Sequence, residues 1–217
     1  MEEVLSLYQQ PADPVRARIC FDERPCQLVD DVVTPLRMKP GKAAKEDNEY
    51  VRQGTCVVLL AYDLDSGIRY TQVRERRTKA DYAQFMKHVI ATYYADKEYI
   101  DVIQDNLNTH KYGSFYEHLP LPQARALSRK LKFHFTPKHG SWLNMAEIEF
   151  SALARQCLNR RIGSLSVLAE QVDLWTTERN QRAVKVHWSF TVATAEEKLK
   201  RWYEQVNPAN KPTESNK

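Results

Sequence analysis

The sequence lacks any run of about 18 apolar residues, so no segment of it resembles a membrane-spanning helix. We expect no secretory signal, because the sequence starts with Met1-Glu2-Glu3, where a signal would be basic and then apolar. The composition, 42% hydrophobic and 28% charged residues in a chain of 217, is typical of a globular protein. We therefore expect one cytoplasmic domain that does not engage a membrane.

Cysteine is scarce and scattered. The four residues, Cys20, Cys26, Cys56 and Cys157, form neither a CxxC pair nor a Cys/His cluster with zinc-finger spacing. We predict that all four are reduced thiols. A zinc site made of Cys20, Cys26 and a distant histidine is the alternative, and its irregular spacing argues against it.

The excess of positive charge is small, since 32 Lys and Arg are balanced by 28 Asp and Glu, which gives a formal net charge of +4. Attraction to a polyanion must therefore come from local clusters. Three clusters are present: Arg74, Arg76, Arg77 and Lys79; Arg129, Lys130 and Lys132; and Arg155, Arg160 and Arg161. They could neutralise nucleic-acid phosphates, although basic residues on helices are commonly only a solvated face.

Several strands are predicted from apolar alternation and turn residues. Alternation over 15–22 predicts a strand that ends at Asp22. Residues 30–53 contain two prolines, a glycine and several basic side chains without an apolar period, which predicts a long exposed basic loop. The runs 55–64 and 68–75 flank an Asp-Ser-Gly turn and predict an antiparallel hairpin.

Helices are predicted where apolar residues recur at helical spacing. One stripe consists of Tyr82, Phe85, Met86, Val89, Ile90, Tyr93 and Tyr94, and another, in a helix over 144–161, consists of Met145, Ile148, Ala152, Leu153 and Cys157. Further helices at 121–130, 166–179 and 194–205, the last opened by the capping box Thr194-x-x-Glu197, and strands at 99–104 and 132–136 complete the pattern. This order predicts an α/β domain over 1–206, with a lead-in at 1–14 and a disordered polar tail at 207–217.

Three acidic residues occupy positions from which they could converge. Asp22 and Asp105 each end a predicted strand, and Glu147 lies in the first turn of a later helix. If the two strands are neighbours, the side chains meet at one edge of the sheet. Carboxylate oxygens suit Mg²⁺ or Mn²⁺, and two such ions about 4 Å apart can catalyse phosphodiester chemistry without a covalent enzyme intermediate.

Each acid also has a purely structural interpretation. Asp22 could be a turn residue, Asp105 could form an Asx-turn, and Glu147 could be the capping-box partner of Asn144. Taken singly, these interpretations are favoured, because exposed acids are common and metal sites are rare.

Three strings around these acids resemble the signatures of DDE-type transposases of mariner-like bacterial insertion sequences. They are Phe21-Asp22-Glu23, Asp105-Asn106-Leu107-Asn108-Thr109-His110 and Thr136-Pro137-Lys138-His139-Gly140-Ser141-Trp142-Leu143-Asn144-Met145-Ala146-Glu147. They occur in the family's order, with 82 residues between Asp22 and Asp105 and 41 between Asp105 and Glu147. Segments 50–55 and 75–79 are also similar, so the resemblance spans nearly the whole chain.

The resemblance implies an RNase H-like, retroviral integrase-like fold with a mixed five-stranded sheet flanked by helices. It implies that Asp22, Asp105 and Glu147 are the catalytic triad and hold two Mg²⁺ ions, for which Mn²⁺ substitutes. The implied reaction is metal-dependent cleavage of DNA at transposon ends, followed by joining of the 3′-hydroxyl to a target, typically TA. The implied protein is a homodimer that acts on DNA in the nucleoid.

Other residues receive secondary roles in this scheme. We expect Asn106 and Asn144 to support the triad, and we expect DNA contacts from Arg52, Arg74, Arg76, Arg77, Lys79 and Lys138. The neighbouring acids Glu23, Asp30, Asp31 and Glu149 are assigned surface or supporting roles. His110 and His139 are expected to be structural, because two-metal chemistry does not need a histidine base.

The sequence departs from the family at three places. Met145 and Phe150 stand where many relatives have Pro and Trp, but neither position supplies a metal ligand. Only 21 residues precede Asp22, too few for a helix-turn-helix beside the first strand, so we expect that region to be missing or separately encoded. A regulatory transposase remnant that acts by dimerisation, and an RNase H-like nuclease acting on hybrids or junctions, are the alternative functions.

Overall fold

The computed structural model describes residues 1–43 and 45–206, so the predicted polar tail at 207–217 lies outside the described residues. Its centre is a five-stranded sheet with the order β3-β2-β1-β4-β5. The strands are β1 (Arg16–Asp31), β2 (Tyr50–Asp63), β3 (Arg69–Arg74), β4 (Tyr99–Gln104) and β5 (Leu131–Phe135). The pairs β1–β2 and β2–β3 are antiparallel, whereas β1–β4 and β4–β5 are parallel. The predicted mixed α/β sheet is confirmed.

Strand β1 is twice as long as expected, and Asp22 lies in its middle rather than at its end. Only Arg16–Cys20 pair with β4, because β4 is short. Beyond that point β1 pairs with β2 alone, as far as Asp31 opposite Tyr50. The apolar alternation ends where pairing with β4 ends. The rest of β1 belongs to a two-stranded ribbon in solvent, which does not need apolar side chains on both faces. Beyond Cys20, no described strand pairs with the edge of β1 that faces away from β2, and this open edge contains Pro25.

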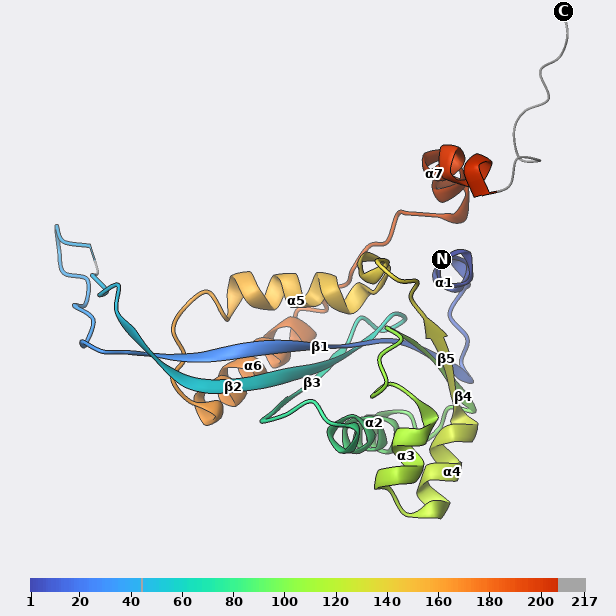
Figure 1. Ribbon diagram of the computed structural model, residues 1–217, viewed down its shortest axis with the longest axis horizontal. Helices are drawn as coiled ribbons and strands as arrows, with labels where there is room; N and C mark the ends of the chain where they lie inside the picture. The colour runs from blue at the N-terminus through green and yellow to red at the C-terminus, as the bar shows by residue number, and fades with distance from the viewer. Residues whose placement is uncertain (44, 207–217) are drawn as a thin grey trace, which may run out of the picture.

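The two strands form an arm that projects from the body of the molecule (Figure 1). The predicted loop at 30–53 is therefore too long, since residues 30–31 and 50–53 belong to the strands. The register shifts between Gln27 and Val29, opposite Gly54, whose φ of +105° favours glycine. At the tip, isolated bridges join Leu36 to Lys45 and Lys39 to Lys42.

One face of the sheet is covered by α2 (Lys79–Tyr93), α3 (Tyr112–His118) and α4 (Leu121–Lys130) (Figure 1). Helix α2 begins at a capping box formed by Thr78 and Asp81, and its stripe packs on Phe21 and Leu59. Tyr93 was predicted in that stripe but is 47% exposed, and it stacks on Tyr70 instead. Helix α3 was not predicted, because seven residues are too few to establish a helical period.

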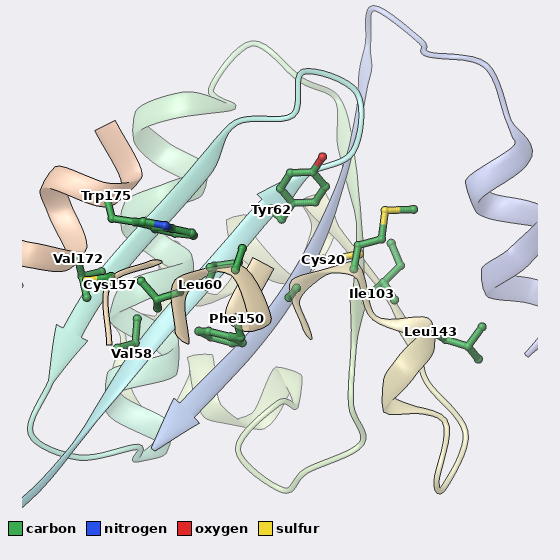
Figure 2. Packing of buried hydrophobic residues seen from close by; sticks show 14 of the residues in the cluster. Cys20, Val58, Leu60, Tyr62, Ile103, Leu143, Phe150, Cys157, Val172 and Trp175 are labelled. Atoms are coloured by element: carbon green, nitrogen blue, oxygen red, sulfur yellow. The ribbon is translucent and has the colours of Figure 1, made fainter. Parts of the chain in front are cut away.

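The opposite face is covered by α5 (Met145–Gln156) and α6 (Leu165–Gln181), while α1 (Glu2–Gln9) contacts β5 and α7 (Val192–Val206) at the margin of the same core. Figure 2 shows side chains of β1, β2, α5 and α6 meeting in this core, among them Cys20, Leu60, Phe150, Cys157 and Trp175. Cys20 and Cys26 lie six residues apart on one strand, so the alternative zinc site does not form. All four cysteines are free thiols, as predicted.

Three predictions on this face were wrong in detail. The lead-in at 1–14 contains the unpredicted helix α1, which buries Val4, Leu5 and Leu7. Helix α7 begins at Val192 rather than after Thr194, because the Thr191 hydroxyl accepts a hydrogen bond from Thr194 N–H (3.2 Å). Helix α5 ends at Gln156, preceded by the 3₁₀ turn η1 (Ser141–Leu143). Within residues 1–43 and 45–206, no helix is both long and apolar enough to cross a membrane.

Candidate active site

Asp22 faces the α5 side of the sheet from the middle of β1, where it is half-buried. Its Oδ1 accepts a hydrogen bond from Glu23 N–H (2.8 Å). Burial, helped by the negative charges of Glu147, Asp105 and Glu23, raises the pKa of Asp22 to about 7, although that hydrogen bond opposes the rise. The predicted triad therefore shares one region, where Asp22 feels repulsion from both other members.

Asp105 comes directly after β4, the strand parallel to β1. Its Oδ1 accepts hydrogen bonds from Leu107 N–H (3.2 Å), as in the Asx-turn interpretation, and from His110 Nδ1 (2.5 Å). Burial works to raise the pKa of Asp105, but the hydrogen bond and charge of His110 outweigh it and hold the pKa below its usual range. Asp105 is thus the anionic partner of a histidine, whereas Asp22 has no such partner.

Glu147 lies in the first turn of α5, and Asn144 fixes where that helix begins. The Asn144 side-chain oxygen accepts from Ala146 N–H (3.1 Å), and its Nδ2 donates to the carbonyl of Phe21 (2.8 Å), next to Asp22. Asn144 N–H donates to Ser141 O (2.7 Å), so Glu147 does not complete a capping box with it. The carboxylate of Glu147 is left available for another partner.

His110 is completely buried and bridges two carboxylates. Its Nδ1 faces Asp105, and its Nε2 lies 2.7 Å from Glu23 Oε2. Burial lowers the pKa of His110, but the hydrogen bonds to Asp105 and Glu23 prevail and raise it to about 9. His110 is therefore an imidazolium at neutral pH. Sequence reasoning missed this bridge, because Glu23 is 87 residues away.

The basic residues are placed unevenly around this region. Arg77 Nη1 lies 3.8 Å from Glu23 Oε1, with the Arg77 side chain 58% exposed, and Arg77 also lowers the pKa of Asp105. Lys79 is held by Glu117 on α3 (2.8 Å), and Arg74 donates to Gln72 (2.7 Å).

The remaining predicted contacts lie on exposed loops or strands. Arg76, Asn106 and Lys138 are exposed, and Asn106 accepts a hydrogen bond from Lys111. Arg52 lies on the arm, away from the triad.

The neighbouring acids do not all lie on the surface. Glu23 is buried by His110, and Glu149 is completely buried in ion pairs with Arg69 and Arg179. Asp31 pairs with Arg161 on the arm (2.6 Å), and Asp30 is exposed. Glu149 takes the inward position on α5 that was predicted for Ile148, which is 41% exposed.

A divalent cation fits the charges of this region. In the part of the chain that the structure describes, no three His, Cys, Asp or Glu side chains are arranged closely enough to form a metal site. However, the main charge effects on the pKa of Asp22 come from three carboxylates, Glu147, Asp105 and Glu23, and not from a basic side chain. Carboxylate oxygens are hard ligands that suit Mg²⁺ or Mn²⁺ and leave positions open for water and phosphate. Asp22, Asp105 and Glu147 are the residues that could hold such an ion.

Comparison with known proteins points to one family. The family model described as DDE superfamily endonuclease matches residues 17–169. No curated protein matches the chain.

Solved structures of Mos1 mariner transposase share the fold. The paired end complex with Mn is 16% identical over 97% of this chain and 60% of that chain, with a TM-score of 0.57. The strand transfer complex is 15% identical over 98% and 60%, with a TM-score of 0.56. The catalytic domain is 14% identical over 98% and 91%, with a TM-score of 0.53. The chain thus has the predicted RNase H-like fold and spans about 60% of the longer Mos1 chains.

Proposed function

Because the chain belongs to the DDE superfamily of endonucleases, we propose that it is the catalytic domain of a DNA transposase. It cleaves DNA at transposon ends and joins the freed 3′-hydroxyl to target DNA, which we expect to be TA. The observation that supports the proposal is the charge environment of Asp22, because Glu147, Asp105 and Glu23 all raise its pKa and no basic side chain is among the main influences on it. Such an anionic cluster beside exposed arginine is suited to metal-assisted attack on a phosphodiester.

Some residues of the site would bind metal ions, and others position those ligands. Asp22, Asp105 and Glu147 would hold two Mg²⁺ ions, for which Mn²⁺ substitutes. When bound, these ions supply activation of the attacking oxygen and stabilisation of the leaving oxygen. His110 fixes the orientation of the Asp105 carboxylate, and Asn144 keeps Glu147 close to Asp22 by tying α5 to β1.

The DNA approaches the exposed side of this cluster. Arg77 stands next to Glu23, and Lys138 lies in the loop that leads into α5, so both can meet phosphates near the cleaved bond. Arg52, Arg74, Arg76 and Lys79 would contact DNA farther out. Recognition of transposon ends would require a helix-turn-helix, which is not among the elements of the described residues.

We propose that the chain forms a homodimer. We also propose that this dimer is cytoplasmic and associated with the nucleoid. The tip of the arm exposes Val32, Val33, Leu36 and Met38, which is an unusual concentration of apolar side chains for a projecting loop. A second copy of the chain would cover them. Size-exclusion chromatography with light scattering should give a dimer that is lost in Leu36→Asp/Met38→Asp.

Nicking of supercoiled plasmid by the purified chain tests the reaction. We expect nicking with Mn²⁺ or Mg²⁺, none with EDTA, and none for Asp105→Ala. The matched control is Asp96→Ala, which removes an exposed carboxylate and should leave nicking unchanged. Nicking that survives both EDTA and Asp105→Ala would refute the proposal. DNA binding without any nicking would favour the regulatory remnant.

A further inference from the structure

We propose that a groove along the base of the arm is a second DNA-binding surface, which takes phosphates about five to seven base pairs from the cleaved bond. This arm groove consists of two adjoining hollows of about 600 and 190 Å³ that share Arg160. Arg52, Arg161 and Tyr50 line the larger hollow, and Arg24 lines the smaller one. The inference rests on the proposed function, because it takes Asp22 as the place of cleavage.

The walls of the groove are basic. None of the described residues that line the two hollows is Asp or Glu. Among the described residues, Arg52 and Arg24 form no ion pair, and Arg160 donates only to neutral groups, Gln171 and the Cys157 thiol. Their guanidinium groups therefore keep donors for a ligand. Because Arg binds phosphate through two parallel hydrogen bonds, these residues match a polyanion in their chemistry.

Arg161 has a different role, because its own partners already hold it. It forms an ion pair with Asp31 (2.6 Å) and donates to the backbone carbonyls of Asp47 (2.6 Å) and Glu49 (3.0 Å). Its guanidinium also lies 5.8 Å from the centre of the Tyr50 ring. Arg161 thus neutralises an acid of β1 and steadies an aromatic ring that is 48% exposed, next to the free donors of Arg52.

The groove is held rigid by the segment that connects α5 to α6. Val29 N–H donates to Ile162 O (2.9 Å), so the connecting segment pairs with the open edge of β1. At Gly163 the chain passes so close to Asp30 that an added Cβ would lie 2.7 Å from Asp30 Cγ. Arg160 and Arg161 directly precede this contact, and their backbone is therefore fixed before any ligand arrives.

Strand geometry places the groove relative to Asp22. Arg24 is two residues beyond Asp22 and lies on the same side of β1. Gln27 and Val29, which line the larger hollow, are five and seven residues beyond Asp22 and, by the same alternation, face the other side of β1, so the groove follows the edge of the strand. At about 3.3 Å per residue the distance along β1 is roughly 17–23 Å, and B-DNA rises about 3.4 Å per base pair, which gives the stated five to seven base pairs. A duplex lying along this edge of β1 would meet the triad and the groove together.

Equilibrium binding of fluorescent duplexes to the full chain in EDTA tests the proposal without cleavage. The test variant is Arg52→Gln/Arg160→Gln. The control is Lys87→Gln/Arg125→Gln, which removes the same charge from the helices on the opposite face of the sheet. The test variant should bind every duplex more weakly, and its slope of log affinity against log salt should fall by about 2, since each phosphate contact contributes about 0.9. The control should keep the wild-type slope.

Duplex length provides a second measurement. With hairpin-capped duplexes of about 5, 10 and 15 base pairs, wild-type affinity should rise sharply once the duplex spans both surfaces, and the rise should be absent in the test variant. A test variant with the slope and length dependence of the control would overturn the groove even if the wild type nicks plasmid. Loss of dimerisation with unchanged DNA affinity would assign the groove to a second copy and also overturn it. A wild-type chain that binds through the groove but never nicks would contradict only the proposed function.

Discussion

His110 Nδ1 and Asp105 Oδ1 are joined by a 2.5 Å hydrogen bond across a tight turn. This hydrogen bond fixes the orientation of the Asp105 carboxylate. We predict that His110→Asn lowers both nicking and Mn²⁺ affinity by about 10–100-fold, because partners behind a metal ligand orient it. Isothermal titration with Mn²⁺ measures this independently of activity.

The chain offers a matched control for this substitution. His134 also bridges two carboxylates, Asp101 and Glu3, but it lies on β5, away from the triad. His134→Asn should leave Mn²⁺ affinity unchanged. Glu23→Gln, which keeps the shape of the other carboxylate at His110, should weaken Mn²⁺ binding less than His110→Asn does. Equal Mn²⁺ affinity in wild type and His110→Asn would contradict the positioning role.

Glu149→Ala should destabilise the fold severely. Glu149 and Arg69 are both completely buried, and Arg69 Nη2 donates to Glu149 Oε1 (2.8 Å). Removing the carboxylate leaves a buried guanidinium without a counter-charge, at a cost of about 3–5 kcal/mol in the free energy of unfolding. Urea denaturation measures it. Glu178→Ala breaks the exposed pair with Arg182 and should cost at most about 0.5 kcal/mol. Similar losses in the two variants would show that burial of the pair does not matter.

Gly140→Ala should disturb the segment that leads to Glu147. An added Cβ at Gly140 would lie 2.6 Å from Pro137 Cγ and 2.9 Å from Pro137 O, and neither atom is on a flexible chain. We expect lower thermal stability together with reduced nicking. Gly113→Ala is the control, because its Cβ would meet only Glu117 Oε1 at 3.7 Å and α3 would gain helix propensity. Unchanged stability and nicking for Gly140→Ala would show that the loop can relax.

The link between α1 and β5 should depend on pH through His134. Hydrogen bonds to Asp101 and Glu3 raise the pKa of His134 above its ordinary value of 6.5, although burial opposes this. A histidine with a raised folded-state pKa contributes stability that is complete below the unfolded value and lost as pH rises through the folded one. Burial works to raise the pKa of Asp101, yet His134 and Arg16 hold it below 3.8, so its contribution is lost only in stronger acid.

The window of greatest contribution therefore lies between about pH 4 and 6.5. Urea unfolding across pH 4–9 should show a stability difference between wild type and His134→Gln that shrinks as pH rises above 6.5. A difference that grows with pH would reverse the assigned sign.

Secondary structure was predicted correctly where the local sequence has a clear apolar period. Strand β4 and helix α4 were predicted at their observed bounds, because apolar period and flanking turn residues agree there. The end of β1 was not, since its second half pairs with one strand and has no apolar requirement. Likewise α1 is too short to show a period, and only the packing around it makes it stable.

The candidate site shows the same division. Asp22, Asp105 and Glu147 stand in recognisable strings, so they could be predicted as one site. The bridge from Glu23 to Asp105 through His110 could not, because it joins residues on separate strands. The burial of Glu149 could not be predicted either. An acid at an inward position of a helix is buried only when basic side chains pair with it, and here these are arginines from β3 and α6.

The open edge of β1 has a consequence for how copies of the chain behave in solution. Unpaired strand edges are sites where one molecule can extend the sheet of another, and the end product of that process is a fibre. Pro25 lies within this edge and lacks the N–H that an incoming strand would need. The hydrogen bonds between β1 and β2 can form only if the Pro25 nitrogen faces away from β2. The missing N–H donor is therefore on the open edge of β1. Pro25 thus opposes the addition of a strand from another molecule to β1, the strand that carries Asp22.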